Sequence, residues 1–422
     1  RPGSSRSASD PTTAPAPTWP ERRSPSASPV SWHGWARSGC STPPPPNPAA
    51  PSCEVHGRCE SPAHSTDAGA RQPTTVGIVA SVPRPLVRRS ISIPGCFLGF
   101  AVVAVLSMVA LPVLGIVDQL RGRRRFHLAR VWLLALAALG TETIGVLWLG
   151  AVWLRFAPLG RIDSPRSHAA FRRTQLWWTG SHLRGLRWFA GVAPEIDDPE
   201  ALHEGNVVAA AHHVSHADAV LPAYLFGVVG DLQLRYTLKA ELQWLPALDV
   251  AGNRLPNVFV DRAPGPDSPV LHDLTELAAG VGHDTAAVIF PEGTFFTPER
   301  LDRASTRLAT HRPDLESRAR SLRHMLPPRP AGMLALLRGA PHADVVIIGH
   351  AGLSSFSSLG DIVRTIPLRD SWRVRTWRHP RAEVPTDPDE IVTWLVDRWL
   401  EVDAWIDEQL ADRDRPRPAA AA

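Results

Sequence analysis

The stretch "NVVAAAHHVSHADAVLPAYL", residues 206–225, changes character twice. Small apolar residues run to Ala211, three histidines and an aspartate follow, and a helical pattern begins at Ser215. A short apolar run stopped by turn residues predicts a buried strand. Ser215, with Asp218 three positions later, predicts the N-cap and capping box of a helix. The stretch therefore predicts a strand, a turn and a helix, which is the repeating unit of an α/β fold.

Further apolar runs end in polar or turn residues in the same way: LQLRYTLK (232–239), NVFVDR (257–262), TAAVIFPEGT (285–294) and ADVVIIGHAGL (343–353). Their wide spacing leaves room for the crossover helices that a parallel sheet requires. We therefore expect an α/β domain with a largely parallel central sheet flanked by helices. In such a sheet, binding and catalytic residues gather at the carboxyl ends of the strands. A periodic amphipathic helix is expected over residues 389–410.

Two longer apolar runs precede this region. Ile93–Val117 contains 25 uncharged residues, and Val131–Trp153 contains a single ionisable group, Glu142. Each run exceeds the roughly 20 residues that a helix needs to cross a bilayer. The sequence therefore predicts a membrane hairpin over residues 91–155, and two buried helices of a soluble protein are the alternative. Arginines lie before, between and after the runs, which favours a shallow re-entrant hairpin with every flank on one side.

The remaining segments complete the domain plan. Residues 1–90 are rich in Pro, Ser, Ala and Thr, and residues 411–422 in Pro, Arg and Ala, so both are expected to be disordered tails. Residues 156–200 interleave tryptophans with arginines, which is typical of an amphipathic segment at a headgroup surface; an ordinary core helix is the alternative. Residues 201–410 contain the strand pattern and form the expected catalytic domain.

The composition of the chain excludes several kinds of partner and site. The formal charge of +4 is modest for 422 residues, so nothing indicates a nucleic-acid partner. Lys239 is the only lysine in an arginine-rich chain, so arginine abundance alone is not a binding signal. All four cysteines lie before residue 100. A disulfide framework, a thiolate zinc site and a cysteine nucleophile are therefore excluded from the later region.

The histidine cluster admits three interpretations. In the first, Ser215 and Asp218 only cap a helix. In the second, Asp218 leans back from the first helical turn towards His213, and a carboxylate held on one imidazole nitrogen leaves the other nitrogen as a base. In the third, His212, His213, His216 and Asp218 bind a metal ion. His212 and His216 straddle the turn, however, and no HExxH motif supports a metal. We therefore expect a catalytic His213–Asp218 pair and no metal.

Four motifs occur in a characteristic order. HHVSHAD (212–218) is followed by TLKAELQWLPAL (237–248), FVDR (259–262) and FPEGTF (290–295). These motifs resemble those of the lysophospholipid acyltransferase family, which acylates glycerol phosphate, lysophosphatidate and related lysolipids. The family's NHxSxxD, FIDR and FPEGTR are similar to the first, third and fourth motifs, with His212 in the Asn place. The resemblance covers about residues 175–408 and implies an acyltransferase catalytic domain.

The resemblance implies a role for each matching position. His213 would be the general base that takes the proton of the acceptor hydroxyl, which then attacks the acyl thioester, and Asp218 would orient His213. Arg262 would bind the acceptor phosphate, because a guanidinium can form two bonds to it. The substrate-binding positions implied in this way are Lys239, Arg262, Glu292, Gly293 and Thr294. The expected donor is acyl-CoA or acyl carrier protein, without a cofactor. No GxSxG motif supports a serine acyl-enzyme.

One position departs from the family pattern. Phe295 stands where the family usually has arginine, so either Arg300 or Lys239 compensates, or the acceptor headgroup differs. The sequence thus predicts a membrane-bound O-acyltransferase that acylates a lysophospholipid, with 1-acylglycerol-3-phosphate as the expected acceptor. Its catalytic domain is expected on the cytoplasmic side of the cell membrane. A catalytically inactive lipid-binding or scaffold protein of the same fold and a metal-dependent hydrolase are the other hypotheses.

Overall fold

A computed structural model of the chain describes residues 82–123, 125–215, 218–260, 268–353, 359–368 and 371–414. In these residues the strands form a sheet with the order β1-β7-β6-β2-β5-β3-β4. Neighbouring strands are parallel, except that β7 runs antiparallel to β6. The strands are β1 (Pro194–Ile196), β2 (Val207–Ala211), β3 (Gln233–Lys239), β4 (Asn257–Val260), β5 (Thr285–Ile289), β6 (Asp344–Ala351) and β7 (Trp372–His379). The expected α/β fold with a largely parallel sheet is confirmed.

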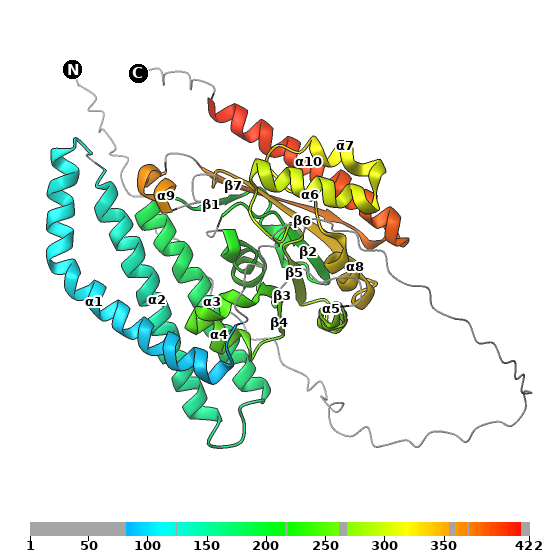
Figure 1. Cartoon of the computed structure of the whole chain (residues 1–422). Coiled ribbons are helices and arrows are strands. Elements are labelled where there is room, and N and C mark those ends of the chain that lie inside the picture. Colours follow the sequence, from blue (N-terminus) through cyan, green and yellow to red (C-terminus); the bar gives the residue numbers. More distant parts are fainter. Residues whose placement is uncertain are drawn as a thin grey trace, which may run out of the picture. The chain divides into compact units, whose positions relative to one another are not determined.

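Helices cover both faces of this sheet (Figure 1). One face carries α5 (Pro269–Ala279), α8 (Pro330–Gly339) and α10 (Pro388–Asp414), and the other carries α3 (Pro165–Gly185), η1 (Leu186–Ala190) and η4 (Ala223–Val229). The side chains of β2 alternate between two hydrophobic clusters. Val207, Ala209 and Ala211 belong to the α3 side, whereas Val208 and Ala210 belong to the α5 side. A strand buried on both faces needs an uninterrupted apolar run, which VVAAA supplies.

The helix expected from Ser215 is irregular. It begins as a 3₁₀ turn, η3, and continues after Pro222 as the π-helical η4. Pro222 has no N–H to donate to the preceding turn, which accounts for the loss of regular α-helical bonding. The other helical elements are η2 (Glu200–His203), η3 (Asp218–Val220), η5 (Ala240–Trp244), α4 (Pro246–Gly252), α6 (Pro298–His311), η6 (Pro313–Leu315), α7 (Glu316–Arg320), α9 (Leu359–Thr365) and η8 (Arg381–Glu383).

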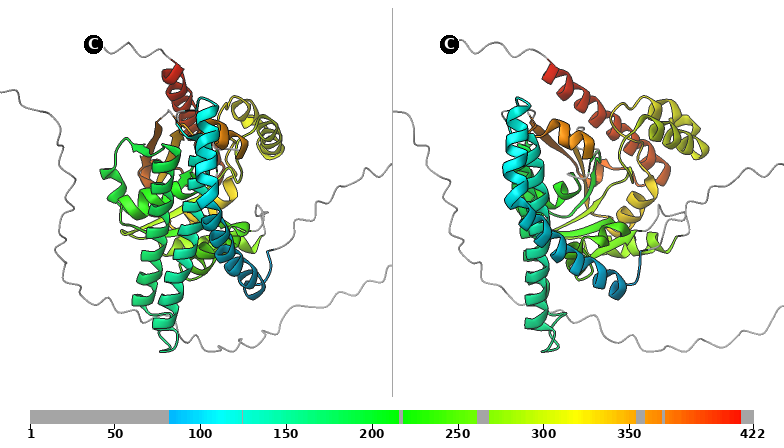
Figure 2. Two further views of the ribbon diagram at one scale, coloured as in Figure 1. Left: turned by 90° about the vertical axis from the view of Figure 1, so that its left-hand side faces the viewer. Right: turned by 60° about the vertical axis from the view of Figure 1, so that its left-hand side comes forward.

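The two N-terminal helices, α1 (Pro85–Leu120) and α2 (His127–Phe156), form an antiparallel hairpin (Figure 2). Trp132 Nε1 donates to Ser107 Oγ at 2.8 Å, and Cys96 Sγ lies 3.6 Å from Thr143 Oγ1. Asp118 Oδ2 accepts the backbone N–H of Leu128, one of the otherwise unpaired donors at the start of α2. By length and composition, each helix is able to cross a bilayer.

The hairpin is also bound to the α/β domain through buried carboxylates at α4. Asp249 accepts hydrogen bonds from Arg88 at 2.5 Å and Arg89 at 2.7 Å, and its carboxylate is fully buried. Glu142 of α2 accepts the N–H of Ala247 at 3.1 Å and the indole N–H of Trp178 at 2.8 Å. Near the other end of the hairpin, Arg130 donates to the Trp188 carbonyl. The hairpin therefore lies along the flank of the domain.

Several predicted boundaries need correction. The hairpin begins at Pro85 rather than residue 91, so the last part of the expected tail 1–90 is helical; residues 1–81 lie outside the described residues. The expected headgroup-surface segment 156–200 contains α3, which packs against α2 and the sheet with Phe171 and Leu183 buried, as the core-helix alternative predicts. The sheet begins at β1, before residue 201. At the other end, α10 continues to Asp414, past the predicted limit of 410.

Candidate active site

The carboxyl ends of three adjacent parallel strands bring the site together. β2 pairs with β6 on one side and β5 on the other. The N–H of His212 donates to the Ile348 carbonyl at 2.9 Å, so the strand pairing extends past the end of β2. His212 and His213 therefore lie beside Glu292, which follows β5, and His350, near the end of β6. This is the edge at which the sequence predicted the site.

His213 and Asp218 form a buried pair. Their Nδ1 and Oδ1 atoms are 2.6 Å apart, and Asp218 Oδ2 accepts the backbone N–H groups of Val214 at 2.7 Å and Ser215 at 2.8 Å. The Asp218 N–H in turn donates to Ser215 Oγ. The same carboxylate thus closes the capping box and binds the imidazole, so the contacts expected from the first two interpretations of the histidine cluster occur together, and the role of His213 as a base stays a prediction.

The ionisation of Asp218 fixes the tautomer of His213. Burial alone would raise the pKa of Asp218, but the hydrogen bond from His213 and the neighbouring His350 outweigh it, so the pKa lies below its ordinary value. A carboxylate only accepts hydrogen bonds, so Nδ1 of His213 carries a proton, and in the neutral form of the imidazole it is Nε2 that has the free lone pair. In the described part of the chain, no group hydrogen-bonds that Nε2. The imidazole is held between Phe290 and Phe295, with ring centroids at 4.7 and 4.4 Å.

His212 and Glu292 form a second buried pair behind the first. His212 Nδ1 lies 2.8 Å from Glu292 Oε1, which also accepts the backbone N–H of His213 at 3.3 Å. Oε2 accepts the N–H of Leu326 at 3.2 Å. Burial raises the pKa of Glu292 to about 8 and lowers the pKa of His212 to about 4. At neutral pH the two groups therefore share one proton as a neutral pair, which avoids burying two charges.

His350 is a site residue that the sequence reasoning missed. Its ring is fully buried, 5.0 Å from the His212 ring and 6.1 Å from Trp372 by centroid. Nε2 lies 3.3 Å from Asp218 Oδ2, without the alignment of a hydrogen bond. Burial lowers the pKa of His350, and the neighbouring Asp218 carboxylate acts in the opposite direction. Its position near the end of the strand ADVVIIGHAGL was the available sequence signal.

Comparison with known proteins agrees with this geometry. Residues 193–351 match the model of a protein family described as Acyltransferase. This segment belongs to the acyltransferase family. A protein of Schizosaccharomyces pombe described as an uncharacterized acyltransferase is 21% identical over 195 residues, which make up 43% of this chain and 53% of that protein. The chain therefore spans about half the length of this relative. The two buried pairs and His350 all lie inside the matched segment.

The acyltransferase segment brings some of the expected substrate-binding residues together. Gly293 has φ +70°, and a Cβ there would lie 3.2 Å from the Arg329 guanidinium, so glycine permits both the turn and the close arginine. Lys239 Nζ lies 5.8 Å from the Phe295 ring centre. Thr294 is half-buried and forms no hydrogen bond within the described part of the chain. Arg262 lies outside the described residues, as does Asp261 of the same motif.

The described residues do not show the ligand cluster of the metal hypothesis. Across the described residues, no three His, Cys, Asp or Glu side chains are grouped to hold a metal ion. His216, one of the four proposed ligands, lies outside those residues. His212 and His213 direct their Nδ1 atoms at different carboxylates, Glu292 and Asp218. The absence of a metal stays a prediction, which metal analysis of the purified protein tests.

The His212–Glu292 pair predicts how the stability of the acyltransferase domain depends on pH. Glu292 ordinarily titrates at 4.5, and burial raises its pKa to about 8, so it costs stability progressively as the pH rises between these values. His212 ordinarily titrates at 6.5 and its pKa is lowered to about 4, so it has the opposite effect between 4 and 6.5. The two contributions oppose each other below about 6.5. Between about 6.5 and 8 the loss due to Glu292 remains.

We expect Glu292→Gln to remove this alkaline loss, because glutamine does not ionise. It keeps an acceptor for Leu326 and a donor for His212 but gives up the acceptor of the His213 N–H. The melting temperature of the wild type should fall from pH 6.5 to 8, and that of the variant should stay level. Glu408→Gln, at an exposed position of α10, is the matched control and should behave as the wild type. Parallel pH profiles for wild type and Glu292→Gln would contradict the neutral pair.

Proposed function

We propose that the protein transfers a fatty acyl group from a thioester, acyl-CoA or acyl carrier protein, to the hydroxyl of a lysophospholipid. The expected acceptor is 1-acylglycerol-3-phosphate, with phosphatidate as the product. The observation that carries the proposal is the 2.6 Å contact between His213 Nδ1 and Asp218 Oδ1, which leaves Nε2 available to act as a base. Membership of residues 193–351 in the acyltransferase family supports acyl transfer in general.

In the proposed reaction a C–O bond forms, a C–S bond breaks, and one base carries the proton from the oxygen atom to the sulfur atom. Nε2 of His213 takes the acceptor O–H proton as the oxygen attacks the thioester carbonyl, forming the new C–O bond. The C–S bond then breaks, and the imidazolium returns the proton to the departing thiolate. Asp218 stays ionised throughout and stabilises the transient imidazolium. The His212–Glu292 pair holds the backbone of His213 through the bond to its N–H, which keeps the base in position.

Three cationic side chains near the base support an anionic acceptor. Burial and then the charges of Arg300 and Arg329 lower the pKa of Lys239, although its neighbour Glu241 acts in the opposite direction. Arg300 donates to the Phe295 carbonyl, so it is partly engaged. Arg329 is half-buried, and no described residue pairs with its guanidinium. A half-buried cation without a counter-ion favours a bound anion, so Arg329 supplies a charge where Phe295 replaces arginine.

Arg329→Gln should therefore weaken binding of a phosphate-bearing acceptor. We expect its KM for 1-acylglycerol-3-phosphate to rise by about ten- to a hundredfold, the worth of a hydrogen bond to a charged group, with a smaller change for an uncharged monoacylglycerol. Arg338→Gln, at an exposed position of α8, removes the same charge away from the site and should leave both values unchanged. Equal effects of Arg329→Gln on the two acceptors would count against phosphate recognition.

We also propose that the hairpin lies in one leaflet of a membrane. The α1 helix exposes large apolar side chains along most of its length, whereas α2 is partly covered by the domain. Contacts at Asp249 and Trp188 tie the hairpin to the domain near both of its ends. A folded domain attached along both ends is difficult to reconcile with two full crossings, but it fits a re-entrant hairpin. A cytoplasmic catalytic domain at the cell membrane remains part of this proposal.

A direct transfer assay tests the function. The full-length protein, in detergent or vesicles, is incubated with labelled acyl-CoA or acyl carrier protein and a panel of lysolipids that differ in headgroup. We expect labelled two-chain lipid, formed fastest from 1-acylglycerol-3-phosphate. Transfer to another lysolipid alone would correct the acceptor but keep the reaction. Binding of lysolipid with no transfer from either donor would favour the inactive lipid-binding alternative instead.

A further inference from the structure

A groove of about 440 Å³ lies between α2 and α3. Its lining from α2 is Trp148, Ala151, Val152, Arg155 and Phe156, and from α3 it is Arg166, Ala169, Ala170 and Arg173. On each helix these positions recur at intervals of three and four, so they share one face. None of them belongs to the strand ends that carry His213, Glu292 or His350. The groove is therefore separate from the acyl-transfer site.

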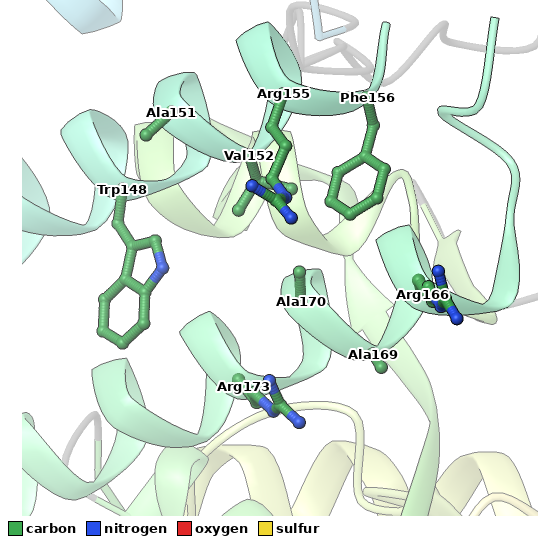
Figure 3. Close-up of a pocket in the computed structure, with 9 residues that line it drawn as sticks. All are labelled: Trp148, Ala151, Val152, Arg155, Phe156, Arg166, Ala169, Ala170 and Arg173. Atoms are coloured by element: carbon green, nitrogen blue, oxygen red, sulfur yellow. The ribbon is translucent and has the colours of Figure 1, made fainter. Parts of the chain in front are cut away.

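The groove combines an apolar floor with a cationic rim. Val152 is buried in the cluster that joins α2, α3 and α4, and Ala170 and Phe156 pack against that cluster. Figure 3 shows the Trp148 and Phe156 rings extending from α2 towards α3, with the alanines leaving space between them. Arginine side chains stand on both helices around this space. An amphiphile with an apolar body and a negative head matches such a surface.

Among the described residues, the three arginines have no internal counter-ions. In the described part of the chain, Arg155, Arg166 and Arg173 form no ion pair or hydrogen bond, although Arg155 lies 5.8 Å from the centre of the Phe156 ring. All three are exposed, so their positive charges face the outside of the groove. Their convergence on one hollow favours a ligand with a phosphate, because a guanidinium binds phosphate through paired N–H groups.

The surrounding surface indicates that the phosphate comes from a lipid. Next to the lining residues of α2, the side chains of Leu147, Trp153 and Leu154 are all more than half exposed. Exposed indole and leucine side chains beside arginines are typical of a surface at the level of phospholipid headgroups. We infer that this groove binds a bilayer phospholipid with a net negative headgroup, with the phosphate among the arginines and the apolar part against Trp148 and Val152.

Vesicle binding tests whether the three groove arginines give the protein a preference for anionic phospholipid. The full-length protein is mixed with vesicles of phosphatidylcholine alone or of phosphatidylcholine with phosphatidylglycerol. Near an anionic surface each arginine is worth about fivefold in affinity, so replacing Arg155, Arg166 and Arg173 together by glutamine should weaken binding to the mixed vesicles by about 100-fold. Binding to phosphatidylcholine should change little. The matched control replaces Arg303, Arg338 and Arg373, which are exposed on α6, α8 and β7, and should retain the preference.

A second variant distinguishes lipid binding in the groove from general electrostatic attraction between arginines and an anionic vesicle. Ala169→Trp keeps every charge but fills the space between the helices, so it should abolish most of the preference for phosphatidylglycerol vesicles. Short-chain phosphatidylglycerol below its micelle concentration should raise the melting temperature of the wild type but not of either groove variant, and inorganic phosphate should have no effect.

A retained preference in Ala169→Trp, or equal stabilisation by phosphate alone, would overturn the lipid site. So would a higher KM for acyl-CoA in the groove variants with unchanged vesicle binding. Because binding and melting are measured without acyl transfer, these results do not depend on the proposed reaction.

Discussion

His213→Ala is expected to reduce the rate constant for acyl transfer by about 10²–10⁴-fold, the usual contribution of a positioned histidine base. A lipid hydroxyl is scarcely ionised at neutral pH, so removing Nε2 removes the proposed acceptor of its proton. The KM for the lysolipid should change much less, because the cations Lys239 and Arg329 remain in place. Single-turnover transfer of labelled acyl groups measures the chemical step directly.

Two comparisons make the His213→Ala result specific. His203→Ala alters an exposed histidine of η2 and should retain wild-type activity. The melting temperature of His213→Ala should remain close to that of the wild type, although loss of contacts with Phe290 and Phe295 will cost some stability. Transfer by a folded His213→Ala protein within threefold or so of the wild type would remove the base from the mechanism.

The sequence predicted the parts of the fold that depend on local patterns. The uniformly apolar run of β2 and its polar turn were sufficient to predict a buried strand followed by a capped helix. The pair His213 and Asp218 is only five residues apart, so helix geometry alone could bring its members together. The two helices of the hairpin could also be predicted, because the length of an apolar run is a local property of the sequence. Its first helical turns were missed because the arginines before Ile91 resembled a polar flank.

Other parts of the site depend on contacts across long distances in the chain. Glu292 reaches His212 from 80 residues away, and its partner could not be chosen before the order of β2 and β5 was known. His350 approaches Asp218 because β6 pairs with β2, and Arg329 lies beside Gly293 for a similar tertiary reason. Composition gave no help with Arg329, because arginine is common throughout the chain.

The partners of two buried carboxylates, one in the hairpin and one in α4, could not be predicted from the sequence either. Glu142 was visible as the lone ionisable group of its run, but its role as a cap for α4 required the structure. Asp249 was not identified from the sequence, although its carboxylate is fully buried and forms ion pairs with Arg88 and Arg89. These contacts place the flank of α4 against the hairpin. The hairpin and the acyltransferase domain are consequently joined by specific polar contacts as well as by apolar packing.

Asp218→Asn is expected to lower acyl transfer by about 10⁴-fold while the protein stays folded. The amide oxygen can still accept the N–H groups of Val214 and Ser215, so the capping box remains satisfied. The amide nitrogen must then face Nδ1 of His213, 2.6 Å away in the wild type, and it donates a hydrogen bond where the carboxylate accepted one. His213 is thereby fixed as the tautomer with its proton on Nε2, the nitrogen that must be empty to act as the base.

Asp218→Ala separates this tautomer effect from a loss of structure. Removing the carboxylate eliminates the cap as well as the contact with His213, so we expect a lower melting temperature, by an amount that corresponds to about 1 kcal/mol or more. His213 is then free to place its proton on either nitrogen. Asp218→Asn should therefore be the more stable of the two variants and yet no more active. If Asp218→Asn instead retained a tenth or more of the wild-type rate, Asp218 would act only as a cap, and Nε2 of His213 would need another group to keep it unprotonated.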